Sequence, residues 1–189
     1  MIRYERDPDT RLAPKEYKAL HPFGTAPVII DGDVVLAESG AIIDYIISKY
    51  GGGRFTLKAN DPNFSNYLFW YHFANGSMMP AMSNNFVVNC ISSGTRADNH
   101  PIVETLLQRV YRAFDMVEKR LGTVDYFAGS EFTAADIMML FPLTTMRVFT
   151  PLDLTPYPNI RAYLKRIGAR PAYQRAMKKG DPDFMPLLD

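Results

Sequence analysis

The sequence predicts a small α/β unit over about residues 1–52, followed by an all-helical domain over about residues 61–178. Two short β-branched runs with an Asp-Gly pair at 31–32 between them predict a β-hairpin, because Gly tolerates the positive φ angle of a tight turn. Three glycines at 51–53 predict the end of a helix and a linker. After that linker every segment with a clear apolar period is helical, so the two parts belong to different structural classes.

The elements of the first part follow one another closely. Apolar and polar residues alternate over 2–6, which predicts a short strand. A helical stretch at 15–20 ends before a proline, and the β-branched runs at 28–30 and 34–36 predict the two strands of the hairpin. A helix then begins at position 38 or 39. Its apolar residues recur at helical spacing, and they are Ile42, Ile43, Ile46, Ile47 and Tyr50.

The second part begins with a long helix that contains two prolines. Pro62 lies near the start of this helix, where a proline is tolerated, whereas Pro80 should kink or break it. The clearest apolar stripe predicts a helix that begins at Pro101 and ends before Gly122. A last amphipathic helix is predicted around residues 160–167.

The stretch "FTAADIMMLFPL" predicts a helix with a defined N-terminus. Thr133 is a good N-cap, and Asp136 lies three residues further on, which is the spacing of a capping box. Phe132 and Ile137 are placed for a hydrophobic staple. The helix that follows is apolar on nearly all sides and is therefore expected to be buried. We assign Thr133 and Asp136 to stability rather than to catalysis.

Composition excludes several classes of function. The chain of 189 residues has a net charge of +1, so no strong field favours nucleic acid or an anionic membrane. Cys90 is the only cysteine, so an intrachain disulfide is excluded, and the low cysteine content fits a cytoplasmic location. Cys90 itself is expected to be a small buried apolar residue. No partner at zinc-like spacing accompanies His21, His72 or His100, so we predict no metal site.

Three motifs in this order, "HPFGTAPVI", "LAESGAIIDYI" and "FTAADI", resemble those of cytosolic glutathione transferases, especially the fungal and bacterial branch. The resemblance implies an incomplete thioredoxin-like N-terminal domain over 1–52 and an all-α C-terminal domain over 61–178. It also implies conjugation of glutathione to small hydrophobic electrophiles, with glutathione as co-substrate and no other cofactor. Family members dimerise, so a homodimer in the cytoplasm is expected.

The resemblance assigns glutathione to two pairs of residues. Ala26 and Pro27 match the family's pair with a cis proline, which exposes the backbone groups of Ala26 to the extended tripeptide. Glu38 and Ser39 match the start of the helix that receives the γ-glutamyl carboxylate, while Glu38 meets the ammonium group. The alternatives are an ordinary turn proline for the first pair and a plain helix cap for the second.

Other positions carry less specific expectations. Many relatives have a lysine where Thr25 stands, and Thr25 cannot neutralise the glycyl carboxylate. His21 or Lys15 is a possible substitute, and a purely structural role for His21 is equally open. In the family the first long helix faces the electrophile, although its residues here are more simply read as core. These residues are Trp70, Tyr71, Phe73, Met78 and Met79.

The resemblance also raises a question about activity. In the family, one strand and one helix precede the stretch that corresponds to Ile2, and the loop between them carries the catalytic Ser, Tyr or Cys. Tyr4 is not its counterpart, because it is predicted to lie within the second strand, so the catalytic residue is unknown. A truncated enzyme of impaired activity and a non-catalytic binding or dimerisation module both remain open. In the second case Phe64, Tyr67 and Phe69 would anchor the interface or face the core.

Overall fold

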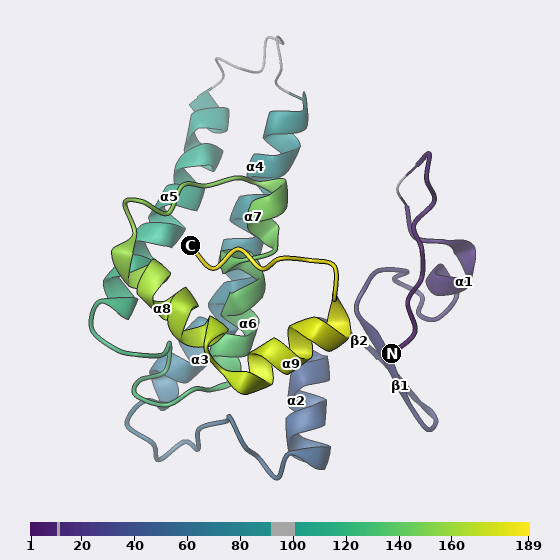
Figure 1. Cartoon of the computed structure of the whole chain (residues 1–189), viewed down its shortest axis with the longest axis horizontal. Coiled ribbons are helices and arrows are strands. Elements are labelled where there is room, and N and C mark those ends of the chain that lie inside the picture. Colours follow the sequence, from purple (N-terminus) through teal and green to yellow (C-terminus); the bar gives the residue numbers. More distant parts are fainter. Residues whose placement is uncertain (11, 92–100) are drawn as a thin grey trace. The chain divides into compact units, whose positions relative to one another are not determined.

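The computed structural model describes residues 1–10, 12–91 and 101–189, and among them it divides the chain into two compact units. The first unit is Met1–Arg54 and the second is Phe55–Asp189. The first contains a two-stranded sheet with two helices, and the second is helical throughout (Figure 1). The expected division into a small α/β part and an all-helical part is therefore confirmed.

The first unit is built around the predicted hairpin. Strand β1 (Val28–Asp31) pairs antiparallel with β2 (Val34–Ala37). Gly32 adopts φ 60°, the left-handed conformation that the tight turn requires. Helix α1 (Lys15–Lys18) precedes the hairpin, and α2 (Ser39–Tyr50) follows it and packs on β2.

The apolar core of this unit is small. Ala37, Ile42 and Ile47 are its buried apolar residues. Of the apolar residues predicted to form the stripe of α2, Ile42 and Ile47 are buried, whereas Ile46 is exposed.

The strand predicted over residues 2–6 is absent. These residues have no regular secondary structure and are mostly exposed. An alternating pattern gives a strand only when a neighbouring strand satisfies its backbone, and the sheet of the described residues has two strands, neither of which pairs with 2–6. Tyr4 therefore does not lie within a strand, contrary to the prediction. Tyr4 instead packs edge-to-face on Tyr17, with ring centroids 5.2 Å apart.

A polar clamp joins the hairpin turn to the end of α2. Oδ2 of Asp31 accepts hydrogen bonds from Tyr45 Oη at 2.8 Å, Lys49 Nζ at 2.7 Å and Tyr50 Oη at 2.6 Å. The bond from Lys49, followed by those from Tyr50 and Tyr45, lowers the pKa of Asp31 to about 2. The clamp ties the far end of the hairpin to a helix that begins at its other end.

The clamp predicts an acid-sensitive hairpin. Because the pKa of Asp31 is lowered in the fold, its contribution is present above the unfolded value, about 3.9, and is lost as the pH falls toward about 2. We expect the amide protection of residues 28–31 to fall over this pH range in the wild type relative to Asp31→Asn. A difference between the two proteins that stays constant with pH would contradict the prediction. Hydrogen-exchange protection factors provide the measurement.

The second unit contains the remaining elements in chain order. They are α3 (Phe64–Phe73), the π-helical turn η1 (Ala74–Met78), α4 (Met79–Ile91), α5 (Pro101–Leu121), α6 (Ala134–Leu143), α7 (Met146–Phe149), α8 (Pro158–Gly168) and α9 (Pro171–Gly180). Helix α3 packs chiefly on α6, α4 lies beside α5, and α5 also packs on α8 (Figure 1).

The first long helix is disturbed but not broken at its internal proline. Pro80 lies inside α4, directly after the π-helical turn η1. Proline has no N–H to donate to the carbonyl group four residues earlier, here that of Gly76, and its ring crowds that carbonyl. The wider π turn accommodates the missing bond, so the expected kink takes the form of a local change in helical winding.

Helix α6 is buried at the centre of the second unit, as its composition predicted. The capping box of Thr133 and Asp136 is present at its start, and the Thr133 N–H donates to Asp136 Oδ2 at 2.8 Å. Asp136 Oδ1 also accepts from the Phe127 N–H at 3.0 Å and from Tyr163 Oη at 3.2 Å. Burial raises the pKa of Asp136, and these donors oppose that effect.

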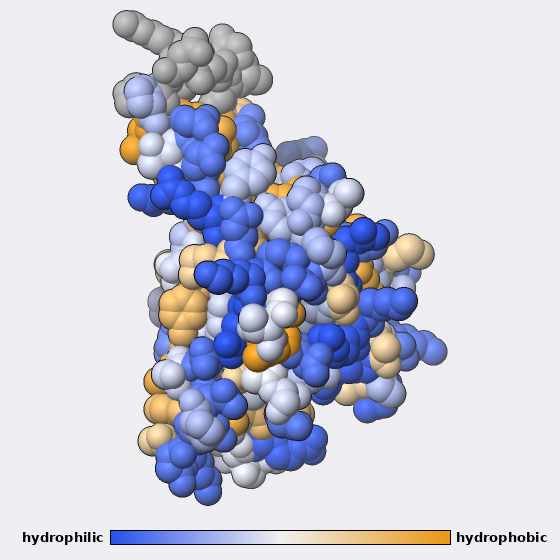
Figure 2. Space-filling model, turned by 90° about the vertical axis from the view of Figure 1, so that its left-hand side faces the viewer, coloured by the Kyte–Doolittle hydropathy of each residue, from blue (hydrophilic) through white to orange (hydrophobic). Residues whose placement is uncertain are grey.

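The surface of the second unit departs from expectation at one residue. Cys90 is exposed near the end of α4, so its assignment to the core was wrong. The face shown in Figure 2 is mostly hydrophilic, and its apolar residues lie in small separate groups. Within the part of the chain that the structure describes, no helix is both long enough and apolar enough to span a bilayer.

Candidate functional site

The hairpin brings the two residue pairs predicted to bind glutathione to one end of the sheet. Val28 begins β1, Ala37 ends β2, and the two are register partners. The pair 26–27 precedes β1 and the pair 38–39 follows β2, so both pairs leave the same end of adjacent strands. Directly paired residues of antiparallel strands have Cα atoms about 4.5–5.5 Å apart, so a single peptide-sized ligand can contact both pairs.

The first pair has the backbone geometry that the resemblance implied. The Ala26-Pro27 peptide bond is cis, and both residues are exposed. The backbone of Ala26 is therefore accessible beside the start of β1. An extended ligand in this position would lie along the strand and exchange backbone hydrogen bonds with it.

The second pair differs in detail from the sequence interpretation. Glu38, and not Ser39, is the N-cap of α2, and the Glu38 side chain makes no capping hydrogen bond. Ser39 is instead the first helical residue. Glu38 adopts φ 72° and ψ 115°, a conformation that non-glycine residues rarely occupy and that concentrates at functional sites. An exposed carboxylate is thereby held at a helix N-terminus, whose partial positive charge also favours a ligand carboxylate.

The remaining predicted positions lie close to the first pair in sequence. Thr25 is exposed directly before Ala26. His21 forms a local turn, in which its Nδ1 accepts from the Phe23 N–H at 3.3 Å and its carbonyl oxygen accepts from the Gly24 N–H at 2.9 Å. This arrangement gives His21 a structural role and leaves its part in ligand binding a prediction. Lys15 is exposed at the start of α1.

The aromatic residues of the first long helix are mostly core, which was the simpler of the two interpretations. Trp70, Tyr71 and Met78 are buried, and Phe73 and Met79 are partly buried. Trp70 packs on Phe127 with ring centroids 5.0 Å apart, within the second unit. Trp70, Tyr71 and Met78 therefore belong to the core of the second unit.

An exposed aromatic pair that the sequence did not reveal lies elsewhere on the second unit. Phe86 of α4 and Phe149 of α7 pack edge-to-face with centroids 6.4 Å apart, and they are 40% and 55% exposed. Val148, next to Phe149, is also exposed. Large apolar side chains that stay in contact with water in pairs offer a surface for an apolar ligand. Sequence periodicity gave no signal, because α7 is a single turn.

Comparison with known proteins decides the family. The profile described as "Glutathione S-transferase, N-terminal domain" matches residues 3–54, and the profile described as "Glutathione S-transferase, C-terminal domain" matches residues 77–171. The chain belongs to the glutathione S-transferase family. The match over residues 3–54 contains every position assigned above to glutathione.

Individual relatives support the same assignment. Glutathione S-transferase 3 of Schizosaccharomyces pombe is 29% identical over 93% of this chain and 76% of its own length. Glutathione S-transferase 1 of Triticum aestivum is 33% identical over 89% of this chain and 78% of its own length. The crystal structure of a glutathione S-transferase from Actinobacillus pleuropneumoniae is 34% identical, superposes with a TM-score of 0.82, and covers 96% of this chain and 83% of that chain.

The proposed interface anchors differ in their exposure. Of the three proposed interface anchors, Tyr67 is buried, Phe64 is partly buried and stacks on Tyr67, and Phe69 is 48% exposed. Among the described residues, no three His, Cys, Asp or Glu side chains come together as metal ligands do. His100 lies outside the described residues.

Proposed function

We propose that this glutathione S-transferase family member binds glutathione through the backbone of Ala26 and the side chains of Glu38 and Ser39. The observation that carries the proposal is the meeting of the two residue pairs at one end of the hairpin. Ala26 would pair with the cysteinyl part, Ser39 and the N-terminus of α2 would receive the γ-glutamyl carboxylate, and Glu38 would receive the ammonium group. Pro27 shapes the turn, and Thr25 and His21 lie toward the glycyl end.

We propose that the reaction joins the glutathione sulfur to a small apolar electrophile. The thiol loses its proton to solvent, the thiolate attacks an electrophilic carbon, and a carbon–sulfur bond forms as the leaving group departs. Glutathione acts as co-substrate, with no other cofactor, and we place the protein in the cytoplasm.

The rate should be low wherever no hydroxyl group donates a hydrogen bond to the glutathione sulfur. A free thiol has a pKa of roughly 8.5, and a hydroxyl group that donates to the sulfur favours the thiolate at neutral pH. None of the residues assigned to glutathione supplies such a donor at the sulfur, and we assign no catalytic residue. The test uses immobilised glutathione and a chromogenic electrophile, with this chain and with a version preceded by the strand, hydroxyl-bearing loop and helix of a relative. Absence of both retention and turnover in the longer version would exclude the enzyme.

Substitutions at the helix start predict the loss of glutathione affinity. Ser39→Ala removes one hydrogen-bond donor to a carboxylate, and Glu38→Gln removes a charge opposite the ligand ammonium. Each should weaken binding by about tenfold, the size expected for a charge-assisted hydrogen bond. Thr25→Lys should strengthen binding, because it adds a cation near the glycyl carboxylate. Isothermal titration of glutathione provides the measurement.

A matched control is available at the other end of the hairpin. Asp33 is an exposed acidic residue in the turn. Asp33→Asn removes a charge from the same hairpin but should leave glutathione affinity unchanged. Equal losses from Asp33→Asn and Glu38→Gln would show that net charge, and not the proposed contact, controls binding.

A second candidate function is a non-catalytic module that binds or dimerises through its helical surface. The exposure of Phe69, stacked on Phe73 with ring centroids 5.4 Å apart, favours such an interface. A homodimer is also compatible with the enzyme. Light scattering at low concentration tests the interface, and Phe69→Ser should shift the equilibrium toward the monomer. A strictly monomeric wild type would count against this module.

A further inference from the structure

The polar clamp at Asp31 lies at one end of the hairpin, and the proposed glutathione site lies at the other. Asp31 is the last residue of β1, beside the turn. The pairs 26–27 and 38–39 leave the opposite end of the same two strands. Helix α2 joins both ends, because its first residue, Ser39, belongs to the site and its last residue, Tyr50, belongs to the clamp. A displacement at one end of this helix therefore reaches the other end.

Three side chains of α2 converge on one carboxylate oxygen. Tyr45 Oη, Lys49 Nζ and Tyr50 Oη lie 2.8, 2.7 and 2.6 Å from the Oδ2 atom that accepts their hydrogen bonds. Lys49 Nζ also donates to Tyr45 Oη at 2.8 Å, and it lies 5.1 and 5.3 Å from the centroids of the two tyrosine rings. The clamp thus attaches the second half of α2 to the end of β1 through linked hydrogen bonds.

The apolar packing of α2 is limited by comparison. In the described part of this unit, the buried apolar side chains are those of Ala37, Ile42 and Ile47. At the start of the helix Glu38 has φ 72°, a conformation that persists only where the surrounding structure enforces it. Because the apolar core is small, the clamp supplies a substantial part of what holds the helix, and with it the backbone of Glu38, on the sheet.

We propose that Asp31 is a positioning residue, whose clamp on α2 sets where the start of that helix meets the γ-glutamyl part of glutathione. This inference rests on the proposed glutathione site, and Asp31 itself touches no part of the ligand. Helix α2 has 12 residues and is therefore about 18 Å long, so that a tilt of about 5° at the clamp displaces its start by about 1.5 Å. The cysteinyl part of glutathione, which would pair with Ala26 beside β1, does not depend on the position of α2.

Two ligands separate this positioning role from a general effect on stability. Glutathione carries the γ-glutamyl carboxylate and ammonium groups, whereas N-acetylcysteinylglycine keeps the amide and the cysteinyl part but lacks both groups. Asp31→Asn should weaken the binding of glutathione about threefold to fivefold, the range for loss of an exposed ion pair. The affinity for N-acetylcysteinylglycine should stay the same. Titrations of the full chain followed by amide chemical shifts measure both affinities.

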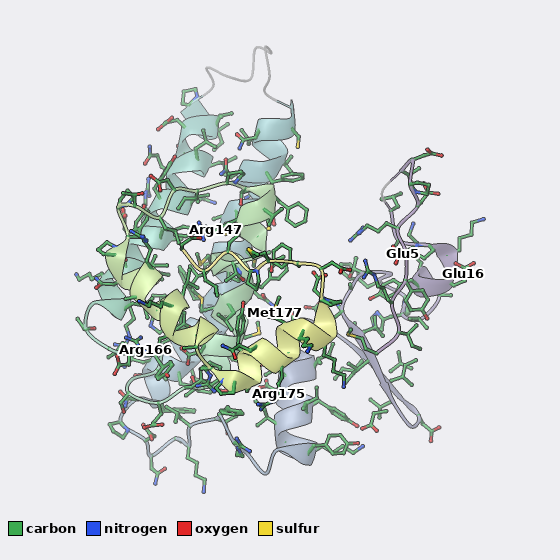
Figure 3. The ribbon with its side chains drawn as sticks, viewed as in Figure 1. Glu5, Glu16, Arg147, Arg166, Arg175 and Met177 are labelled. Atoms are coloured by element: carbon green, nitrogen blue, oxygen red, sulfur yellow. The ribbon has the colours of Figure 1, made fainter. Side chains whose placement is uncertain are left out.

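Further variants test whether the clamp acts as a unit. Lys49→Met should weaken glutathione binding in the same direction, and the double variant should resemble Asp31→Asn alone, because both changes act on one contact. Lys49→Arg keeps a cation within reach of the carboxylate and should retain most of the affinity. Asp33→Asn and Glu16→Gln are the controls. Each removes an exposed acidic side chain of the same unit outside the clamp, Glu16 on α1, and should leave both affinities unchanged (Figure 3).

The amide of Ile42 provides a readout that needs no ligand. It donates to the carbonyl oxygen of Glu38 at 2.9 Å, in the first turn of α2. Its hydrogen exchange should be several times faster in Asp31→Asn than in the wild type, because the helix is less firmly held. Faster exchange in a protein that binds no glutathione would support the coupling between the clamp and the helix start, and it would exclude the proposed glutathione site.

The remaining outcomes bear on Asp31 alone. Unchanged exchange at Ile42, or equal losses of affinity for the two ligands, would overturn its positioning role while glutathione binding itself stands. A loss in Asp33→Asn as large as that in Asp31→Asn would show that the charge of the hairpin turn controls affinity, and it would overturn the role of the clamp as well.

Discussion

Asp136→Ala should lower the free energy of unfolding of the helical unit by about 3–5 kcal/mol, the range for breaking a buried network of charged hydrogen bonds. The Asp136 side chain accepts four hydrogen bonds, including those from the backbone N–H groups of Phe127 and Thr133. Alanine would leave both N–H groups buried without a partner, and each such group costs about 1–3 kcal/mol. Burial of the Asp136 carboxylate is unfavourable and raises its pKa. Removing the carboxylate recovers this cost, but the gain offsets only part of the loss.

The chain provides its own probe for this experiment. Trp70 is the only tryptophan, and its ring packs on Phe127, whose N–H donates to Asp136. Urea unfolding followed by tryptophan fluorescence therefore reports on the network directly. Asp136→Asn should also destabilise the unit, because the NH₂ group of asparagine would face N–H and O–H donors. The loss should be smaller than for alanine, because the amide oxygen can still accept a hydrogen bond. Asp183→Asn, at an exposed position, is the control, and an Asp136→Ala protein within about 1 kcal/mol of the wild type would contradict the prediction.

Glu118→Ala should produce the second large loss of stability, about 2–4 kcal/mol for two charge-assisted hydrogen bonds. Glu118 lies on α5, and its two carboxylate oxygens accept from the N–H groups of Asn159 and Ile160 at 2.9 and 3.0 Å. These groups belong to the first turn of α8, where the N-cap, Tyr157, makes no side-chain cap. A carboxylate from a distant helix thus takes the place of a local capping residue.

Urea unfolding and exchange at two amides test the role of Glu118. The amides of Asn159 and Ile160 should lose protection in Glu118→Ala, with α8 fraying from its start. Glu104→Ala is the control on the same helix, because Glu104 is exposed and pairs only with Gln108 in the described structure. Equal stability changes in the two variants would show that the long-range cap contributes nothing specific.

Local signals in the sequence predicted local structure well. The Asp-Gly turn located the hairpin, Pro101 marked the start of α5, and the Thr133–Asp136 spacing marked the start of α6. Each signal acts within a few residues, so no knowledge of the rest of the fold was needed. The order of the motifs also indicated the family, which the profile matches confirm.

Features that depend on distant partners could not be read in the same way. The alternation at 2–6 needs a neighbouring strand, and Glu118 meets α8 only after 41 residues of chain have folded back. The exposure of Cys90 depends on packing that periodicity does not report. At the candidate site, the motifs pointed to residues 26–27 and 38–39, but the unusual backbone of Glu38 appears only in three dimensions.

The π-helical turn between α3 and α4 changes the direction in which the side chains of the following helix point. Five π-helical residues rotate about the helix axis by roughly a quarter of a revolution less than five α-helical residues do. The inward-facing side of the helix is therefore re-aimed at this point, and α3 packs on α6 while α4 packs on α5. In an uninterrupted α-helix, the same apolar residues would face only one of the two neighbouring helices, α5 or α6. The π-helical turn thus allows one continuous helical segment to pack on α6 before the turn and on α5 after it.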